Sequence, residues 1–130
     1  MDKGELLFEI TEKATSRVIK EFSENGAKFQ FNAEGEVKGK YSGKHIETVD
    51  ILLKQDGSNE FDWHAMEFTK EGDVVMFQGK GTGKQGGFQA QISYVTGSKI
   101  LAWLNSAKGW AEGTANLMTN ETIFKVYAMK

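Results

Sequence analysis

The chain has 130 residues, a length that predicts a single domain over residues 1–130 with a hydrophobic core of its own. It contains no cysteine, which excludes a disulfide framework, a cysteine-ligated zinc site and a catalytic thiol. Its 16 basic and 18 acidic residues are mixed along the chain, so there is no basic stripe for binding phosphates, and nucleic acid is not an expected partner.

The N-terminal segment, MDKGELLFEI, lacks the apolar run of a signal peptide. No segment approaches the ~20 apolar residues that span a bilayer, so no membrane span is expected. The absence of cysteine is compatible with a reducing compartment. These features favour a cytoplasmic location.

The first expected strand is Glu5 to Ile10, and the segment after it, residues 12–22, fits two alternatives. As a helix it would begin after Thr11 and end before Gly26. As a strand it would have Val18 and Phe22 on one face and would lead through a turn at residues 23–26 into the next strand. We expect the strand, because the segment that follows is the clearest strand in the chain.

Ala27 to Tyr41 alternates apolar and polar residues along its whole length, which is typical of a half-buried strand. The apolar face mixes large residues with very small ones. This mixture indicates a tightly curved sheet that closes on itself. The face consists of Ala27, Phe29, Phe31, Ala33, Gly35, Val37, Gly39 and Tyr41.

The rest of the chain predicts further short strands joined by turn residues, with no convincing crossover helix. About ten strands of this kind predict an all-β fold, a single closed antiparallel β-barrel of about eight strands plus short hairpin extensions. Alternating glycine and alanine from Gly109 to Ala115 fit a narrow barrel interior better than a flat sandwich. The expected strands are His45 to Lys54, Phe61 to Thr69, Val74 to Lys80, Phe88 to Thr96, Lys99 to Leu104, Gly109 to Leu117 and Thr122 to Ala128.

The stretch GKGTGKQGGF contains the spacing G-x-G-x-x-G at Gly81, Gly83 and Gly86. A dinucleotide-binding loop with this spacing must be followed by a helix, whose N-terminal amides hold the pyrophosphate. The residues from Phe88 onward instead alternate as a strand. The glycines therefore predict bends or close backbone approach within a sheet, and no cofactor is expected.

Two histidines and two glutamates are the candidate catalytic residues. His45 and Glu47 share a strand face, where we expect a pair at the mouth of the barrel, and the favoured interpretation is a rim pair solvated by water. In the strand FDWHAMEF, one phase turns Glu67 inward and the other turns His64 inward. Either group among aromatic rings could act as a general acid or base, although an outward His64 and a rim Glu67 are favoured. With two histidines on different strands and no ligand spacing between them, no metal site is expected.

Aromatic residues predominate on the expected inner faces. Filling the core is their default role, and they line a ligand cavity only if the barrel is wide enough to leave one. The candidate ligand-binding residues are Phe29, Phe31, Tyr41, Trp63, Phe77, Phe88, Tyr94 and Trp103.

Four motifs occur in a recognisable order along the chain: Glu21-Phe22-Ser23, Gly35 to Gly39, Gly79 to Gly83 and the run SKILAWLNSAKGWAEG from Ser98 to Gly113. In this order the chain resembles the allene-oxide-cyclase-like β-barrels, and most of all their small bacterial and archaeal members of unknown function. The last run is the most specific, being similar to the group's Gly/Ser-x-x-Leu-Ala-x-Leu-x-Gly-x-x-Gly-x-Gly. It departs from that pattern at Ser106, where the group has glycine, and at Lys99 and Trp110.

The resemblance covers the central and C-terminal parts of the chain. It implies a calycin-like antiparallel barrel that forms a homo-oligomer, a trimer or dimer. In some relatives the lumen holds a lipid-like or polyketide-like substrate. The catalytic residues of those relatives do not map onto a motif here.

Two functions follow from these expectations. The first is a barrel that encloses an apolar or amphipathic small molecule and acts as a cofactor-free cyclase or isomerase, mainly by holding a flexible substrate in a reactive conformation. The second is a non-enzymatic ligand carrier, or a structural and oligomerising barrel with a filled core. The volume of the interior distinguishes them, since an apolar lumen of roughly a few hundred Å³ is the usual size of a ligand pocket.

Overall fold

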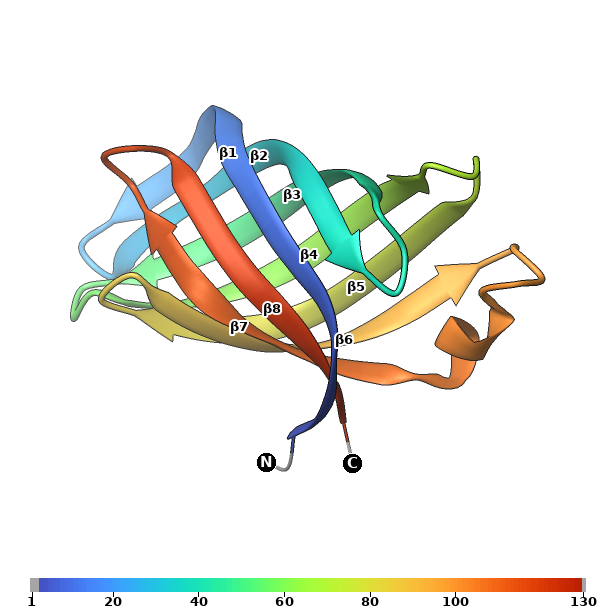
Figure 1. Cartoon of the computed structure of the whole chain (residues 1–130). Helices are drawn as coiled ribbons and strands as arrows, with labels where there is room; N and C mark the ends of the chain where they lie inside the picture. The colour runs from blue at the N-terminus through green and yellow to red at the C-terminus, as the bar shows by residue number, and fades with distance from the viewer. Residues whose placement is uncertain (1–2, 130) are drawn as a thin grey trace.

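Eight antiparallel strands form one closed barrel in the computed structural model, which describes residues 3–129 (Figure 1). Each strand pairs with the next along the chain, and the last pairs with the first. The predicted all-β closed antiparallel barrel is therefore confirmed. The elements are β1 (Lys3–Ser23), β2 (Gly26–Gly39), β3 (Gly43–Lys54), β4 (Ser58–Thr69), β5 (Val74–Lys84), β6 (Gly87–Thr96), the 3₁₀ helix η1 (Ala102–Ser106), β7 (Lys108–Asn116) and β8 (Glu121–Met129).

The ambiguous segment 12–22 is a strand. It is the second half of β1 and pairs with β2 as far as the turn at Gly26. Pairing of β1 with β8 ends at Lys13, so the β1–β2 hairpin continues beyond the barrel wall as an extension. Phe22 near its tip is 79% exposed.

The predicted strand Lys99 to Leu104 is wrong, because most of this segment forms turns and η1. Leu101 and Leu104 are three residues apart, which is one turn of a 3₁₀ helix, and both pack into the core. The side chain of Asn105 holds the segment against β6. Its Oδ1 accepts a hydrogen bond from the Thr96 amide at 2.8 Å, and its Nδ2 donates to the Thr96 carbonyl at 3.0 Å. Within the described residues, no helix is long and apolar enough to cross a membrane.

The glycine-rich stretch forms the end of β5 and its hairpin turn into β6. Gln85 and Gly86 have φ of 55° and 86°, the left-handed pair that a tight hairpin requires. A Cβ at Gly81 would lie 2.3 Å from the carbonyl oxygen of Gln89 and 2.4 Å from the Phe61 ring. Gly81 therefore makes room for an aromatic ring inside the barrel, as expected of a glycine with a role in the sheet.

The two ends of the barrel differ. Because successive strands run in opposite directions, the turns β1–β2, β3–β4, β5–β6 and β7–β8 gather at one end, which we call the hairpin end and which lies at the left of Figure 1. The other end carries η1 and the remaining connections. The core near it is filled by buried side chains: Phe8, Tyr41, Val75, Tyr94, Leu101 and Leu104.

Candidate functional site

A row of inward-facing positions crosses four strands in the middle of the barrel. Glu12 on β1 is paired with Gly35 on β2, Gly35 with His45 on β3, and His45 with Glu67 on β4. Gly35 has no side chain, and a Cβ there would lie 2.7 Å from the Cβ of Glu12. Because no side chain occupies this position, the side chains of Glu12 and His45 meet across β2.

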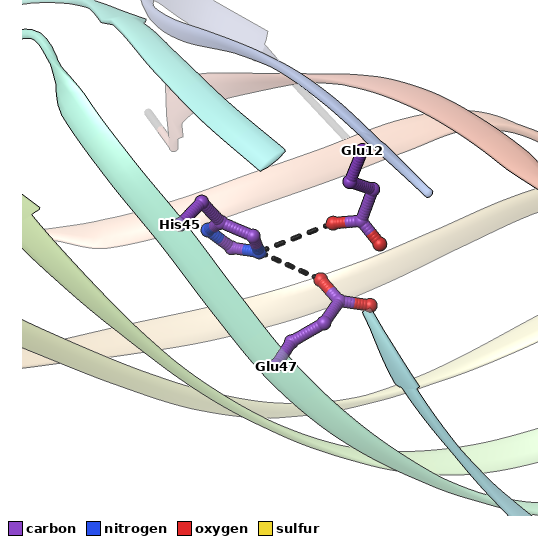
Figure 2. A group of neighbouring side chains, drawn as sticks. All are labelled: Glu12, His45 and Glu47. Atoms are coloured by element: carbon purple, nitrogen blue, oxygen red, sulfur yellow. Dashed lines mark hydrogen bonds and ion pairs between the residues drawn. The ribbon is translucent and has the colours of Figure 1, made fainter. Parts of the chain in front are cut away.

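His45 is the centre of this buried cluster. Its Nδ1 lies 2.6 Å from Oε2 of Glu67, and Tyr41 donates its hydroxyl hydrogen to the other oxygen of Glu67. Its Nε2 lies 2.7 Å from Oε1 of Glu47 and 3.2 Å from Oε1 of Glu12 (Figure 2). Three carboxyl groups thus surround one imidazole in the interior of the barrel.

The environment shifts the protonation of this cluster. Burial, reinforced by the charge of Glu47, raises the pKa of Glu12 to about 9, although the contact with the His45 ring acts in the opposite direction. Burial alone would lower the pKa of His45, but the three carboxyl groups that contact the ring outweigh it and raise the pKa well above its usual value. Burial and the nearby Glu67 also raise the pKa of Tyr41. A protonated Glu12 and a His45 imidazolium are therefore favoured at neutral pH.

Two buried polar groups have no hydrogen-bond partner within residues 3–129. They are the carboxyl group of Glu12, at both of its oxygens, and Nε1 of Trp63. The Glu12 side chain is completely buried, and its contact with His45 has the distance of an ion pair without the geometry of a hydrogen bond. Buried polar groups without partners are rare in folded proteins and require an explanation.

A cavity of about 340 Å³ lies at the hairpin end of the barrel. Arg17 and Asn120 stand at its rim, with the Arg17 guanidinium donating to Oδ1 of Asn120 at 2.6 Å. Glu47 and Thr122 contribute polar groups from the interior. The apolar walls consist of Phe29, Phe31, Val49, Ile51, Leu53, Phe61, Trp63 and Phe88.

This cavity has the size and the lining of a small-molecule site, since such sites measure about 300–1,000 Å³ and combine apolar walls with a few polar groups. A larger hollow of about 810 Å³ adjoins the cavity, with which it shares Asn59, Gly87 and Phe88, and is otherwise lined mostly by charged and polar residues such as Lys54, Lys84 and Lys125. The aromatic enclosure distinguishes the cavity at the hairpin end from that hollow.

The structure brings together three of the four candidate catalytic residues, His45, Glu47 and Glu67. They are buried in the interior, so the expected rim pair and rim Glu67 are wrong. The cause is the register, which places His45 and Glu67 side by side well inside the barrel. His64 is exposed on the outer face, because β4 adopts the phase that turns Trp63 and Glu67 inward, and His64 is not part of the cluster.

The candidate ligand-binding aromatics separate into three groups. Four of them line the cavity: Phe29, Phe31, Trp63 and Phe88. Tyr41, Phe77 and Tyr94 are instead buried in the core. Trp103 is 43% exposed on η1, so its predicted inward position is wrong. The segment is a helix there, and its inward side chains are Leu101 and Leu104.

Sequence reasoning missed Glu12. The first predicted strand ends at Ile10, and residues 12–22 are expected to form a separate strand. If the alternation of inward and outward residues is continued past Ile10, Glu12 lies on the same face as Phe8, Ile10 and Ala14.

Comparison with known proteins supports the fold. No family model matches the chain, and no curated protein matches it. A protein of unknown function from Clostridium acetobutylicum superposes with a TM-score of 0.86 at 14% identity, covering 100% of both chains. A beta-barrel like protein from Acinetobacter baumannii gives 0.80 at 19% identity, covering 97% of this chain and 94% of the other. A protein from Penicillium herquei described only as an enzyme gives 0.70 at 20% identity, covering 98% and 96%.

Proposed function

We propose that the barrel binds an apolar or amphipathic small molecule in the cavity at its hairpin end. The observation that carries this proposal is a cavity of about 340 Å³ with aromatic and aliphatic walls inside a barrel whose other end is filled. Burial of apolar ligand surface against these walls supplies the affinity, at about 25 cal/mol per Å² before the cost of association.

The polar groups indicate how such a ligand lies. Arg17 at the rim favours a ligand whose acidic or polar end stays near the opening, with the apolar part directed inward. Inside, Trp63 lines the cavity and its Nε1 lacks an acceptor within residues 3–129. A ligand oxygen that reached this nitrogen would satisfy it. A carboxylic acid whose apolar chain or ring system carries a second oxygen has this chemistry, and a simple fatty acid meets the requirement at the rim.

Catalysis of an isomerisation or cyclisation is a second candidate function, favoured by the position of Glu47. This residue lines the cavity and also contacts Nε2 of His45 at 2.7 Å. Its carboxylate would take a proton from one carbon of the ligand and return it at another, so that the double bond moves and no redox partner is needed. The apolar walls would hold the flexible ligand in the reactive conformation.

Fluorescence of Trp63 tests the binding proposal. The chain has three tryptophans, and Trp103→Phe with Trp110→Phe leaves Trp63 alone. The probe is ω-bromodecanoate, a fatty acid whose bromine quenches tryptophan only at short range. We expect saturable quenching of Trp63 at one probe per chain.

The matched control is a variant that keeps only Trp103, on η1 beyond the opposite end of the barrel. Its emission should stay constant over the same titration. Absence of saturable quenching at Trp63, or equal quenching in both variants, would contradict the proposal.

The neighbouring structures support the barrel and leave its ligand open, because their identity to this chain is below 25%. Membership of the allene-oxide-cyclase-like group, assembly into a dimer or trimer, and a cytoplasmic location stay predictions. Size-exclusion chromatography with light scattering measures the oligomeric state.

A further inference from the structure

Nε2 of His45 faces two carboxyl groups. Glu67 and Tyr41 hold the opposite side of the ring, since Glu67 accepts at Nδ1 and is itself held by the Tyr41 hydroxyl. In the metal-free protein a proton on Nε2 satisfies these contacts, whereas a neutral imidazole, with its proton on Nδ1, directs the Nε2 lone pair toward Glu12 and Glu47. A divalent cation among the three groups would take the place of that proton, and the carboxyl oxygens already lie 2.7 and 3.2 Å from Nε2.

We propose that Glu12, His45 and Glu47 form a binding site for a divalent transition-metal ion, with Zn²⁺ as the best fit. Their three donor atoms lie within 4.8 Å of one another (Figure 2). Zinc bonds to nitrogen and oxygen of about 2.0–2.2 Å place neighbouring donors about 2.8–3.6 Å apart. The distances from Nε2 to the two carboxyl oxygens, 2.7 and 3.2 Å, require little movement to fit this shell.

The carboxyl group of Glu12 also points to an ion. It is completely buried, and within residues 3–129 neither of its oxygens has a hydrogen-bond partner, although Glu47 and Nε2 of His45 lie close to it. A metal ion bonds directly to such an oxygen. One divalent ion also balances the two carboxylates that would hold it, which removes the cost of burying them uncompensated.

Glu67 completes the pattern of a metal-binding histidine. Histidines that ligate a metal almost always donate their other ring nitrogen to a carboxylate or carbonyl, which fixes the tautomer and orients the ring. Glu67 is a positioning residue in this sense, at 2.6 Å from Nδ1. The mixture of imidazole and carboxylates favours a transition ion over Mg²⁺ or Ca²⁺, which prefer oxygen ligands alone.

Glu47 also provides a route to the site, because it lines the cavity that opens at the hairpin end. The inference does not depend on the proposed ligand, since it uses the cluster alone. If an ion is bound, the carboxylate of Glu47 becomes a ligand, and the ion takes its place as the reactive group beside the cavity.

The expectation that the chain holds no metal site rests on the spacing of its two histidines and does not include carboxylates from other strands.

Metal titration tests the site without any organic ligand. The full chain is treated with a chelator, dialysed and titrated with Zn²⁺, Mn²⁺ and Mg²⁺ by calorimetry. We expect one Zn²⁺ per chain, weaker Mn²⁺ and no measurable Mg²⁺. Glu67→Gln should weaken Zn²⁺ binding by about 10–100-fold, as expected for a residue that orients a ligand.

Two matched pairs of variants locate the site. His45→Asn should abolish stoichiometric binding while His64→Asn, at the exposed histidine, leaves it unchanged. Glu12→Gln should weaken binding while Glu9→Gln, on the exposed face of the same strand, does not. Bound Co²⁺ should also give visible absorption bands that disappear with Glu12→Gln and persist with Glu9→Gln.

Glu12→Gln keeps the shape of the side chain and resembles the protonated acid, so this pair decides the matter even if His45→Asn does not fold. The inference is overturned if the wild-type chain binds no Zn²⁺ at one ion per chain. It is equally overturned if Glu12→Gln and Glu9→Gln bind alike.

Discussion

Replacing Glu12 with glutamine should change how the stability of the metal-free protein depends on pH. In the unfolded chain this carboxyl group loses its proton near pH 4.5, whereas in the barrel its pKa is about 9. Between these values the folded state binds one proton more than the unfolded state. Stability is therefore highest at low pH within this window and is lost as the pH rises.

The size of this loss follows from the linkage of protons to folding. One proton contributes about 1.4 kcal/mol of unfolding free energy per pH unit, or about 3 kcal/mol between pH 6 and pH 8. Glutamine resembles the protonated acid and does not titrate. Glu12→Gln should therefore lose about 3 kcal/mol less than the wild type over this interval, although the raised pKa of His45 makes both proteins less stable as the pH rises above 6.5.

Urea unfolding followed by circular dichroism at pH 6, 7 and 8, with chelator present, measures this difference. Glu9→Gln on the exposed face of β1 is the control and should follow the wild type. If the wild type and Glu12→Gln lose the same stability between pH 6 and pH 8, Glu12 is ionised in the folded protein and the description of the buried cluster is incorrect.

Two further predictions concern the architecture that surrounds the cavity. Gly81→Ala should cost about 1–3 kcal/mol, because its Cβ would lie 2.4 Å from the Phe61 ring, while Gly97→Ala, which would meet nothing within 4 Å, should stay within about 0.5 kcal/mol. Equal unfolding free energies for the two variants would contradict the packing of Phe61 on Gly81. Asn105→Ala should cost about 1–2 kcal/mol in urea unfolding through the loss of both hydrogen bonds to Thr96, whereas Ser106→Ala should be nearly neutral. A stable Asn105→Ala would mean that leucine packing alone holds η1.

Most of the barrel could be predicted from the alternation of apolar and polar residues along the chain. From Ala27 to Tyr41 the period of two assigns every inward side chain, because one face of a barrel strand is always enclosed. The error at η1 has a physical cause. In so short a segment, the spacing of Leu101 and Leu104 fits a strand or a helix. The hydrogen bonds of the Asn105 side chain decide for the helix, and the spacing of apolar residues does not reveal them.

The cluster was only partly predictable. His45, Glu47 and Glu67 were identified as candidates because each shares a face with apolar residues. Their depth in the barrel depends on the register between strands, which places a glycine between Glu12 and His45. The pattern within one strand does not reveal which residues pair with it on the neighbouring strands. For this reason the sequence predicts these residues at the rim, whereas the structure buries them.

The most direct test of the cavity as a ligand site is calorimetric titration of decanoate into two matched variants. Ile51 lines the cavity, so Ile51→Trp fills part of it, whereas Ile123 is 52% exposed on the outer face of β8. The wild type and Ile123→Trp should bind one decanoate per chain with similar affinity, and Ile51→Trp should bind about tenfold more weakly or worse, a loss of about 1.4 kcal/mol. Equal affinities for Ile51→Trp and Ile123→Trp, or no binding by the wild type, would contradict a ligand site at the hairpin end.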